Sequence, residues 1–263
     1  MKRITILLVI FVLPLVLFSQ ENKFEYTPKV KNKIEVSDLL GKIMLKNTTG
    51  NTIVIESDFN LKKPDRADGL MLLGAAEDNT GLGVNLIEEN GVVTIIGVTK
   101  KVKDHTYTIS IPDGIAVNID YHSPFANGDL EIDSYKGSLE LKTLAAGVKL
   151  TNCTGPFTVS SISGDIEAVF GSLNQEQPTS LASVSGLVDV TLPASIKANI
   201  QVSNITGDVY NNLDLKNSSK QNDERSDGLN EIKHRNNSEY TLNGGGQKLF
   251  LKSVSGNIYL RKK

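Results

Sequence analysis

The sequence holds a single cysteine, Cys153, which excludes an intrachain disulfide and a cysteine-based metal cluster. Tryptophan is absent, and aromatic residues make up only 6% of the chain. Basic residues form no run longer than three and the formal net charge is −2, whereas a nucleic-acid binder neutralises phosphates with clustered Lys and Arg. We therefore expect no binding of nucleic acid, and a lone thiol suits an oxidising compartment.

Apolar residues are not scarce, because they form 39% of the 263 residues against 22% charged residues. This composition is too apolar for a disordered chain and suffices for one large domain or two small ones. After the first 20 residues, no apolar run approaches the ~20 residues that a membrane span needs. We expect no transmembrane span in the mature chain.

Residues 1–19 have the layout of a secretory signal peptide. Lys2 and Arg3 precede an apolar run over residues 4–18, and Ser19 is a small residue before a polar stretch. We predict cleavage next to Ser19 and export to the periplasm, the cell surface or the medium. An uncleaved N-terminal anchor is the alternative. Removal of the leader takes away two positive charges and changes the net charge from −2 to −4.

From Gly128 onward the chain repeats a short unit, in which a glycine is followed by apolar residues two positions apart. Alternation with a period of two is the pattern of a half-buried β-strand. The predicted inward residues are Leu130, Ile132, Leu139, Leu141, Val148, Leu150, Phe157, Val159, Ile166, Ala168, Val188, Val190, Leu192, Ile258 and Leu260. The predicted outward residues are Glu131, Glu140, Lys149, Thr158, Glu167, Asp189 and Tyr259.

The repeated glycines are expected to form the corners between strands, because glycine adopts a positive φ without steric cost. A small polar residue stands before several of them, and its hydroxyl is expected to satisfy a backbone group at the bend. These pairs are Ser163-Gly164, Ser185-Gly186, Thr206-Gly207 and Ser255-Gly256.

The glycine spacing predicts an all-β fold of the single-chain β-solenoid, or parallel β-helix-like, class. Glycines 128, 137, 147, 155 and 164 lie 8 to 10 residues apart, and alternate ones along the chain lie 17 to 22 apart. Coils of about 20 residues with two short strands, each stacked on the one before, have both periods. A sandwich of antiparallel hairpins is the alternative, but two-residue hairpin signals occur only at Asn90-Gly91 and Asn127-Gly128.

We expect one β-solenoid domain over residues 20–263. Residues 64–90 are rich in glycine and are predicted to form an irregular excursion. Residues 216–239 are nearly devoid of apolar side chains, which predicts a mobile polar surface insertion within one coil. Earlier strands are expected at residues 33–36, 41–45, 50–55, 92–98 and 106–111. We expect the first three of them to begin the sheet.

Four units of the repeat, residues 163–168, 185–193, 206–210 and 255–260, together resemble the DUF4097 family of exported bacterial β-repeat proteins. The resemblance covers roughly residues 30–263. It implies a parallel β-helix-like fold, a place outside the cytoplasm and an adhesin-like role. It supplies no catalytic residues and no cofactor, and fold by itself does not imply function.

Asp129, Asp165 and Asp208 each follow a corner glycine, so stacked coils would align them in an acidic row. Such a row could bind calcium or a sugar, or aspartate could simply be a favourable turn residue. The coil at Gly147 lacks the aspartate, and the glycine–aspartate nonapeptide of calcium-binding β-rolls is absent. We therefore predict no metal site.

Tyr121, His122 and Ser123 stand together, but the chain has no Gly-x-Ser-x-Gly elbow and no His-Glu-x-x-His pair. His105 and His234 are the other histidines, and a histidine in a loop without a partner motif is expected to be solvated. We predict no catalytic and no cofactor-binding residue.

Three further features are weak candidates for a binding or reactive site. Residues 244–247, Gly-Gly-Gly-Gln, lack the Lys-Ser/Thr of a phosphate loop. Cys153 has no adjacent base to activate it. Tyr210 and Tyr259 follow their glycines on the outer face, where stacked aromatics could hold a glycan or could be ordinary cross-strand packing.

These observations favour an exported, non-enzymatic β-solenoid that binds a glycan or a protein of the cell surface or envelope along an extended face. Two alternatives stay open. One is a partner of an envelope-sensing membrane regulator. The other is a polysaccharide-acting β-helix enzyme, which would need paired carboxylates or a basic cluster in a groove, and the sequence shows no distinguishing pair.

Overall fold

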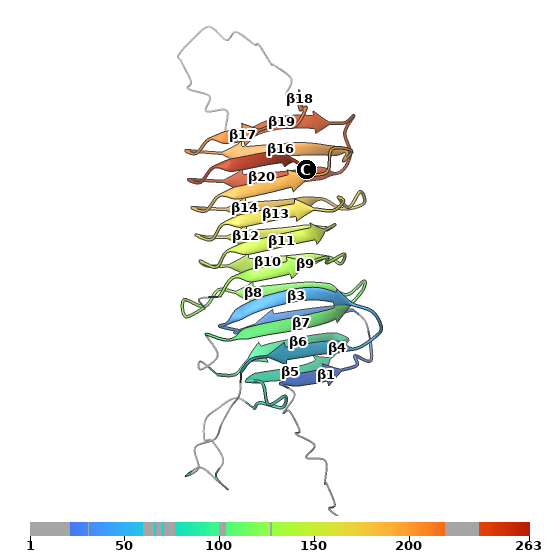
Figure 1. The fold of residues 1–263 in the computed structure, drawn as a ribbon, viewed down its shortest axis with the longest axis vertical. Coiled ribbons are helices and arrows are strands. Elements are labelled where there is room, and N and C mark those ends of the chain that lie inside the picture. The colour runs from blue at the N-terminus through green and yellow to red at the C-terminus, as the bar shows by residue number, and fades with distance from the viewer. Residues whose placement is uncertain are drawn as a thin grey trace, which may run out of the picture.

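The computed structural model describes residues 22–30, 32–59, 66, 70, 77–99, 104–126, 128–218 and 237–263. The expected signal peptide and His234 lie outside this part of the chain. The described residues form an all-β column of stacked strands (Figure 1). None of them belongs to a helix with the length and apolar character that a membrane crossing requires.

The strands belong to two long sheets. In spatial order, sheet A consists of β1 (Lys23–Tyr26), β4 (Ile53–Ser57), β7 (Thr106–Pro112), β3 (Lys42–Thr48), β9 (Leu130–Asp133), β11 (Val148–Cys153), β13 (Ile166–Phe170), β15 (Val188–Leu192), β21 (Ile258–Lys262) and β17 (Val209–Asn211). Taken from the opposite end of the column, sheet B consists of β18 (Lys216–Asn217), β19 (Asn237–Leu242), β16 (Ala198–Asn204), β20 (Lys248–Ser253), β14 (Thr179–Ser183), β12 (Phe157–Ser161), β10 (Leu139–Thr143), β8 (Ala116–Tyr121), β2 (Lys33–Ser37), β6 (Val92–Gly97) and β5 (Val84–Glu89).

Parallel pairing through the middle of both sheets gives the fold its β-solenoid-like character. β11 pairs in parallel with β9 and β13, and β10 pairs in parallel with β8 and β12. Val148 lies opposite Leu130 and Ile166, each 18 positions away, and Ile166 lies opposite Val188, 22 positions away. Within the described residues, antiparallel pairs occur only near the two ends, so the alternative of a hairpin sandwich is wrong.

The core lies between the two sheets, and the inward residues predicted by the alternation are all buried in it. They join Leu249 and Leu251 in one continuous cluster that runs along the column. Each fully buried Leu, Ile or Val contributes about 1.5–3 kcal/mol. A single coil, meaning one strand of sheet B followed by one of sheet A, has only its neighbours to bury this face against.

The expectation that each coil stacks on the one before it is wrong at both ends. The last coil, β20 and β21, lies between the β14–β15 coil and the β16–β17 coil (Figure 1). The early coil β2–β3 is likewise placed between the β6–β7 coil and the β8–β9 coil, so it does not begin the sheet. The inner coils β8 to β15 follow chain order.

The corner glycines serve close approach between coils rather than a positive φ. A Cβ on Gly164 would lie 2.0 Å from the carbonyl oxygen of Ala146, and one on Gly186 would lie 2.2 Å from that of Gly164. Real Cβ atoms do not approach so closely, so a side chain would force the coils apart. Of the glycines predicted to turn with a positive φ, only Gly155 has one.

The backbone caps at the corners also differ from the expectation. The hydroxyl that satisfies the bend comes three residues before the glycine, as Ser183 Oγ accepts from Gly186 N at 2.9 Å. Ser161 and Ser253 do the same for Gly164 and Gly256. Among the four predicted hydroxyls, only Thr206 has a described side-chain hydrogen bond, which it donates to Val254 O.

Two segments expected to be irregular contain strands. β5 falls within residues 64–90 and forms an antiparallel hairpin with β6 through Asn90 and Gly91, whose φ angles are 51° and 77°. Positive φ at both positions is the geometry that Asn-Gly favours. The flanks of the polar segment at 216–239 pair as β18 and β19, and its residues 219–236 lie outside the described part.

Candidate functional site

The predicted acidic row lies where each strand of sheet A begins, and it is interrupted. In spatial order this position holds Asp129, Gly147, Asp165, Leu187, Asn257 and Asp208. It follows a glycine in every one of these coils except that of Gly147, where Ala146 occupies the corner. Gly147 separates the first two aspartates. The interleaved last coil adds Asn257 between Leu187 and Asp208, so Asp208 stands well apart from Asp165. The three aspartates therefore form no continuous ridge.

These side chains cap the backbone of the next coil. Asp129 Oδ1 accepts a hydrogen bond from Gly147 N at 3.1 Å, and Asp165 Oδ1 accepts one from Leu187 N at 2.9 Å. Asn257 Oδ1 accepts one from Asp208 N at 2.9 Å. The acceptor thus recurs in every second coil. This arrangement supports the interpretation of these aspartates as turn residues with a structural task.

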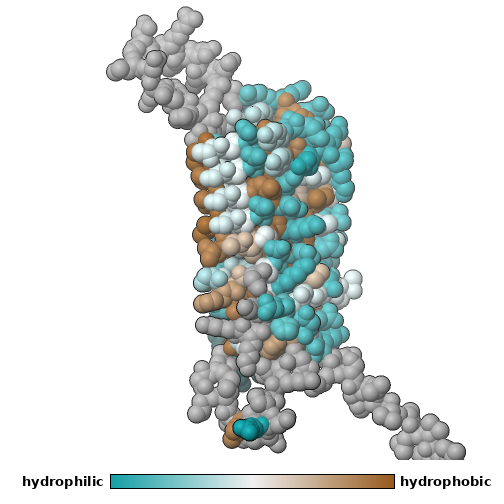
Figure 2. Space-filling view, turned by 60° about the vertical axis from the view of Figure 1, so that its left-hand side comes forward, coloured by the Kyte–Doolittle hydropathy of each residue, from teal (hydrophilic) through white to brown (hydrophobic). Residues whose placement is uncertain are grey.

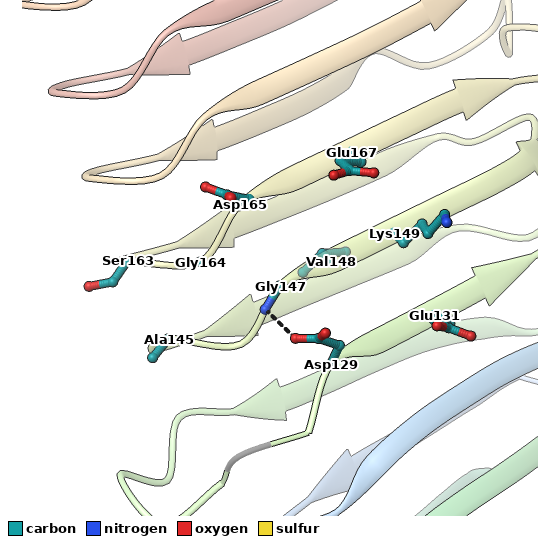
Figure 3. A pocket seen from close by; sticks show the side chains of 10 residues that line it. All are labelled: Asp129, Glu131, Ala145, Gly147, Val148, Lys149, Ser163, Gly164, Asp165 and Glu167. Atoms are coloured by element: carbon teal, nitrogen blue, oxygen red, sulfur yellow. Dashed lines mark hydrogen bonds between the residues drawn. The ribbon is translucent and has the colours of Figure 1, made fainter.

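A shallow groove of about 480 Å³ nonetheless opens between Asp129 and Asp165, where Gly147 has no side chain (Figure 3). Glu131, Lys149 and Glu167 line it on neighbouring strands in register. Lys42 Nζ forms an ion pair with Glu131 Oε1 at 2.8 Å. The groove is therefore acidic, with lysines interleaved, and it can accept hydroxyl and cationic donors.

The groove offers no ligand set for a metal ion. Among the residues that the structure describes, no three His, Cys, Asp or Glu side chains converge closely enough to hold one. The lysine between Glu131 and Glu167 also opposes a second cation there.

An outward row two positions further along each strand ends in an aromatic stack. Its members in register are Glu131, Lys149, Glu167, Asp189, Tyr259 and Tyr210. The rings of Tyr210 and Tyr259 are 5.3 Å apart between centroids and inclined by 12°. The guanidinium of Arg261 lies over the Tyr259 ring at 5.2 Å. Such a stack is a combined cation–π and aromatic contact.

Asp189 fixes Arg261 at one end of this stack. Arg261 Nε donates to both carboxylate oxygens of Asp189, at 2.8 and 2.9 Å. This contact raises the pKa of Arg261, so the guanidinium stays charged over the ring. No sequence signal could have found this pair, because the two residues are 72 positions apart and meet only through the interleaved last coil.

Tyr210 is the open end of the stack. It lies on β17, the edge strand of sheet A, and is 51% exposed. Its hydroxyl donates to Asp208 Oδ2 at 3.2 Å, and the charge of Asp208 raises the pKa of Tyr210, so the phenol keeps its proton. Among the described residues no other ring or cation stacks on Tyr210. A cavity of about 180 Å³ adjoins the two tyrosines, lined also by Asn211, Asn212 and Arg261.

Tyr121, His122 and Ser123 line one cavity of about 400 Å³, but none of the hydrogen bonds described for these side chains joins one of them to another. Tyr121 is buried and its hydroxyl donates to the backbone carbonyls of Leu40 and Gly41. His122 is exposed, as expected, and its Nδ1 lies 2.8 Å from Asp120 Oδ1. Ser123 Oγ accepts from Phe125 N at 3.3 Å.

The remaining sequence candidates have structural roles. His105 Nδ1 lies 3.1 Å from Asp58 Oδ1, which also accepts from Thr106 N. Cys153 is fully buried, and burial raises the pKa of its thiol to about 11, which leaves it unreactive. Residues 244–247 connect β19 to β20 around the end of β16, with Gly245 N donating to Leu242 O at 3.0 Å.

Comparison with known proteins places the fold in a described family. The model of the Toastrack DUF4097 family matches residues 125–261, which confirms the resemblance seen in the repeat units. No curated protein matches the chain.

Two solved structures resemble the chain at low identity. One is a proposed cell adhesion protein from Clostridium sporogenes, with 13% identity, a TM-score of 0.45, and coverage of 92% of this chain and 100% of that one. The other is a proposed adhesin from Bacteroides fragilis, with 14% identity, a TM-score of 0.36, and coverage of 92% and 96%.

Proposed function

This chain belongs to the Toastrack DUF4097 family, and from that premise and the geometry of sheet A we propose that it is an exported, non-enzymatic binding protein with an adhesin-like role. Its partner is a glycan of the cell surface or envelope. The glycan lies along the outer face of sheet A and is anchored at the tyrosine stack of Tyr210 and Tyr259.

The observation that carries this proposal is the exposed ring of Tyr210 at the end of an ordered stack. Tyr259, held by Arg261, fixes the ring plane, so little side-chain entropy is lost when a flat apolar surface packs on it. A sugar ring has such a surface on one side and hydroxyls at its rim. Arg261 supplies donors, and Asn211 and Asn212 supply both donors and acceptors.

The polar row and the acidic groove extend this surface along the column. We take the molecule as a solenoid with coils of about 20 residues, an interpretation supported by the register offsets of 18 and 22 residues. Successive coils then present Asp189, Glu167, Lys149 and Glu131 at a strand spacing of about 4.8 Å. A regular ladder of donors and acceptors suits a polymer with a repeating unit.

Binding is tested with purified protein on a panel of bacterial envelope polysaccharides and host matrix glycans. We expect wild type to be retained and Tyr210→Ala to bind at least about tenfold more weakly. Phe250→Ala is the matched control, because it removes an aromatic ring from the outer face of sheet B, and it should bind like wild type. Failure of wild type to bind any glycan, or equal binding by Tyr210→Ala, contradicts the proposal.

Export and the absence of catalysis are tested separately. Cell fractionation of the full chain should place it outside the cytoplasm, with a new N-terminus next to Ser19. An intact N-terminus in the inner membrane would mean an uncleaved anchor. Release of reducing ends or unsaturated sugars from the same polysaccharides would instead make the protein an enzyme.

A further inference from the structure

A row of exposed aliphatic side chains runs along the corners that lead from sheet B to sheet A. We call it the aliphatic ridge. In spatial order it consists of Leu144, Ile162, Val184, Val254 and Ile205. Ile162, Val184 and Ile205 are 44%, 45% and 52% exposed, and Leu144 and Val254 are half-buried. Figure 2 shows a stacked brown column of apolar residues along one edge of the molecule.

The geometry of the corner does not require these side chains. Each corner is four residues long: the first residue caps the backbone, as Ser183 does, and the fourth approaches the next coil, as Gly186 does. The third is small or polar and exposed, as in Ser185. The second position makes neither a cap nor a close approach, yet it is Leu, Ile or Val in these five corners; His122 takes its place in the corner after β8. Turns ordinarily place polar residues at such exposed positions.

The ridge is rigid, because backbone hydrogen bonds continue through the corners. Ser163 N donates to Leu144 O, and Ser185 N donates to Ile162 O, both at 2.9 Å. Ser255 N donates to Val184 O at 2.9 Å. Each ridge residue is thus held against its neighbours at the strand spacing of about 4.8 Å. Little ordering entropy is lost when a partner docks on it.

The strip beside the ridge carries no charge. It consists of Ala145, Ser163, Ser185, Ser255 and Thr206, followed by Ala146 and the corner glycines. Figure 2 shows this strip as a pale column next to the apolar one. The chain as a whole is acidic and carries charges on both sheets. Two copies that meet through the ridge and this strip therefore place uncharged side chains against each other. The strip borders the acidic groove, which Ala145 and Ser163 line together with Asp165, so a contact that extended beyond the strip would bring like charges together.

We propose that the aliphatic ridge is a self-association surface, on which a second copy of this chain docks its own ridge side by side. The second copy offers the same five side chains at the same spacing, so the rows of the two copies pack against each other along their whole length. A twofold axis through Val184 makes the contact isologous and closed. The strip is narrow, which predicts a weak and reversible dimer at the low end of interface sizes. This site is independent of the tyrosine stack.

The first test is sedimentation velocity of the purified protein over a wide range of concentrations. We expect a monomer–dimer equilibrium for wild type, weakened at least about tenfold in Val184→Lys, which places two ammonium groups at the twofold axis. Thr158→Lys adds the same charge at an exposed site on sheet B and should leave the equilibrium unchanged. A wild type that stays monomeric throughout, or a dimer unaffected by Val184→Lys, overturns the proposal. Binding of the monomer to lipid vesicles instead would also overturn it.

A second test reports which residues of the two copies face each other in the dimer. Because Cys153 is fully buried, Val184→Cys introduces a single accessible thiol. In the proposed dimer the two Val184 positions face each other across the axis, so mild oxidation should give a disulfide-linked dimer. Thr158→Cys should give none. Equal cross-linking of both variants would indicate random collision and contradict the proposal.

Discussion

At the scale of single residues, a column of buried polar side chains joins the coils. Ser183 Oγ accepts from Gly186 N and donates to Gly164 O at 3.0 Å, so one hydroxyl satisfies two backbone groups in adjacent coils. Ser253 repeats both contacts for the corner between β20 and β21. In the corner between β16 and β17, Asn204 replaces the serine and makes the corresponding contacts. A buried polar group that is fully bonded stabilises a unique arrangement, and here it sets the register of neighbouring coils.

Replacement of this hydroxyl should cost more than replacement of its exposed neighbour. We expect Ser183→Ala to lower the free energy of unfolding by about 1–3 kcal/mol, because it leaves Gly186 N–H without its acceptor in a buried corner. Ser185→Ala, two positions away and exposed, should change it by less than about 0.5 kcal/mol. Urea unfolding measures both. Equal effects of the two variants would contradict the assignment of the cap.

The sequence identified the corners but assigned their chemistry to the wrong atoms. It predicted positive φ for the glycines and a cap from the residue just before them. The approach of Gly186 to Gly164 O, and the hydrogen bond from Ser183 Oγ to the same oxygen, depend on a neighbouring coil. The cap from Ser183 to Gly186 N lies within one corner, but the sequence pattern pointed to the residue next to the glycine instead. A contact between coils cannot be predicted from one repeat unit, because the sequence of one unit is compatible both with a glycine of positive φ and with a glycine that approaches a neighbouring coil.

At the scale of elements, one carboxylate connects the edge strands β1 and β5 at the N-terminal end of the column. Glu88 on β5 accepts from Tyr26 Oη at 2.5 Å, and also from Lys29 N and Val30 N, just after β1. These contacts, the Tyr26 hydrogen bond foremost, lower the pKa of Glu88 below its ordinary value of 4.5. The charged carboxylate thus fastens the edge strand β1 across the end of the column.

This contact should make the docking of β1 depend on pH. A carboxylate with a lowered pKa stabilises the folded state above its unfolded pKa of about 4.5, and this stabilisation is lost as the pH falls through the folded value. We expect Glu88→Gln to lower the urea midpoint at about pH 7 and to differ less from wild type at about pH 3. The neighbour Glu89→Gln is the control. A difference that is the same at both pH values would contradict this role.

Most elements could be predicted because period-two alternation is strong wherever one face is buried. The inward residues from Leu130 to Leu260 and the strands at 92–97 and 106–112 follow the sequence pattern. β5 was missed because the glycines before it obscured a strand of ordinary composition, although Asn90-Gly91 signalled the hairpin. The tyrosine pair was found by its position after the glycines, whereas its Arg261 and Asp189 partners were not.

At the scale of the whole molecule, the defining feature is that the chain's last coil is an inner coil. β20 has parallel partners on both sides, β14 and β16, and β21 has β15 and β17. After β15 the chain thus leaves one coil position open and forms the end of the column with β16 to β19. It then returns, and β20 and β21 fill that position. The tyrosine stack exists only because this return places Tyr259 beside Tyr210.

The order of coils could not be predicted from the sequence, since the units at Gly186, Gly207 and Gly256 are nearly interchangeable. Each has the same corner and the same alternation, so local chemistry does not state which unit neighbours which. Chain order is the natural first expectation, and it holds from β8 to β15. The antiparallel pairing of β19 with β16 reverses the chain and makes the interleaved return possible.

Amide hydrogen exchange on the native protein tests this arrangement most directly, because the protection of an amide reports how much of the structure must open to release it. The structure predicts that amides in β20 and β21 exchange as slowly as those in the central strands β12 and β13, although they lie within the last sixteen residues of the chain. The edge strands β1 and β17 should exchange quickly. Fast exchange throughout β20 and β21, with slow exchange in β17, would place the last coil at the open end and contradict the account.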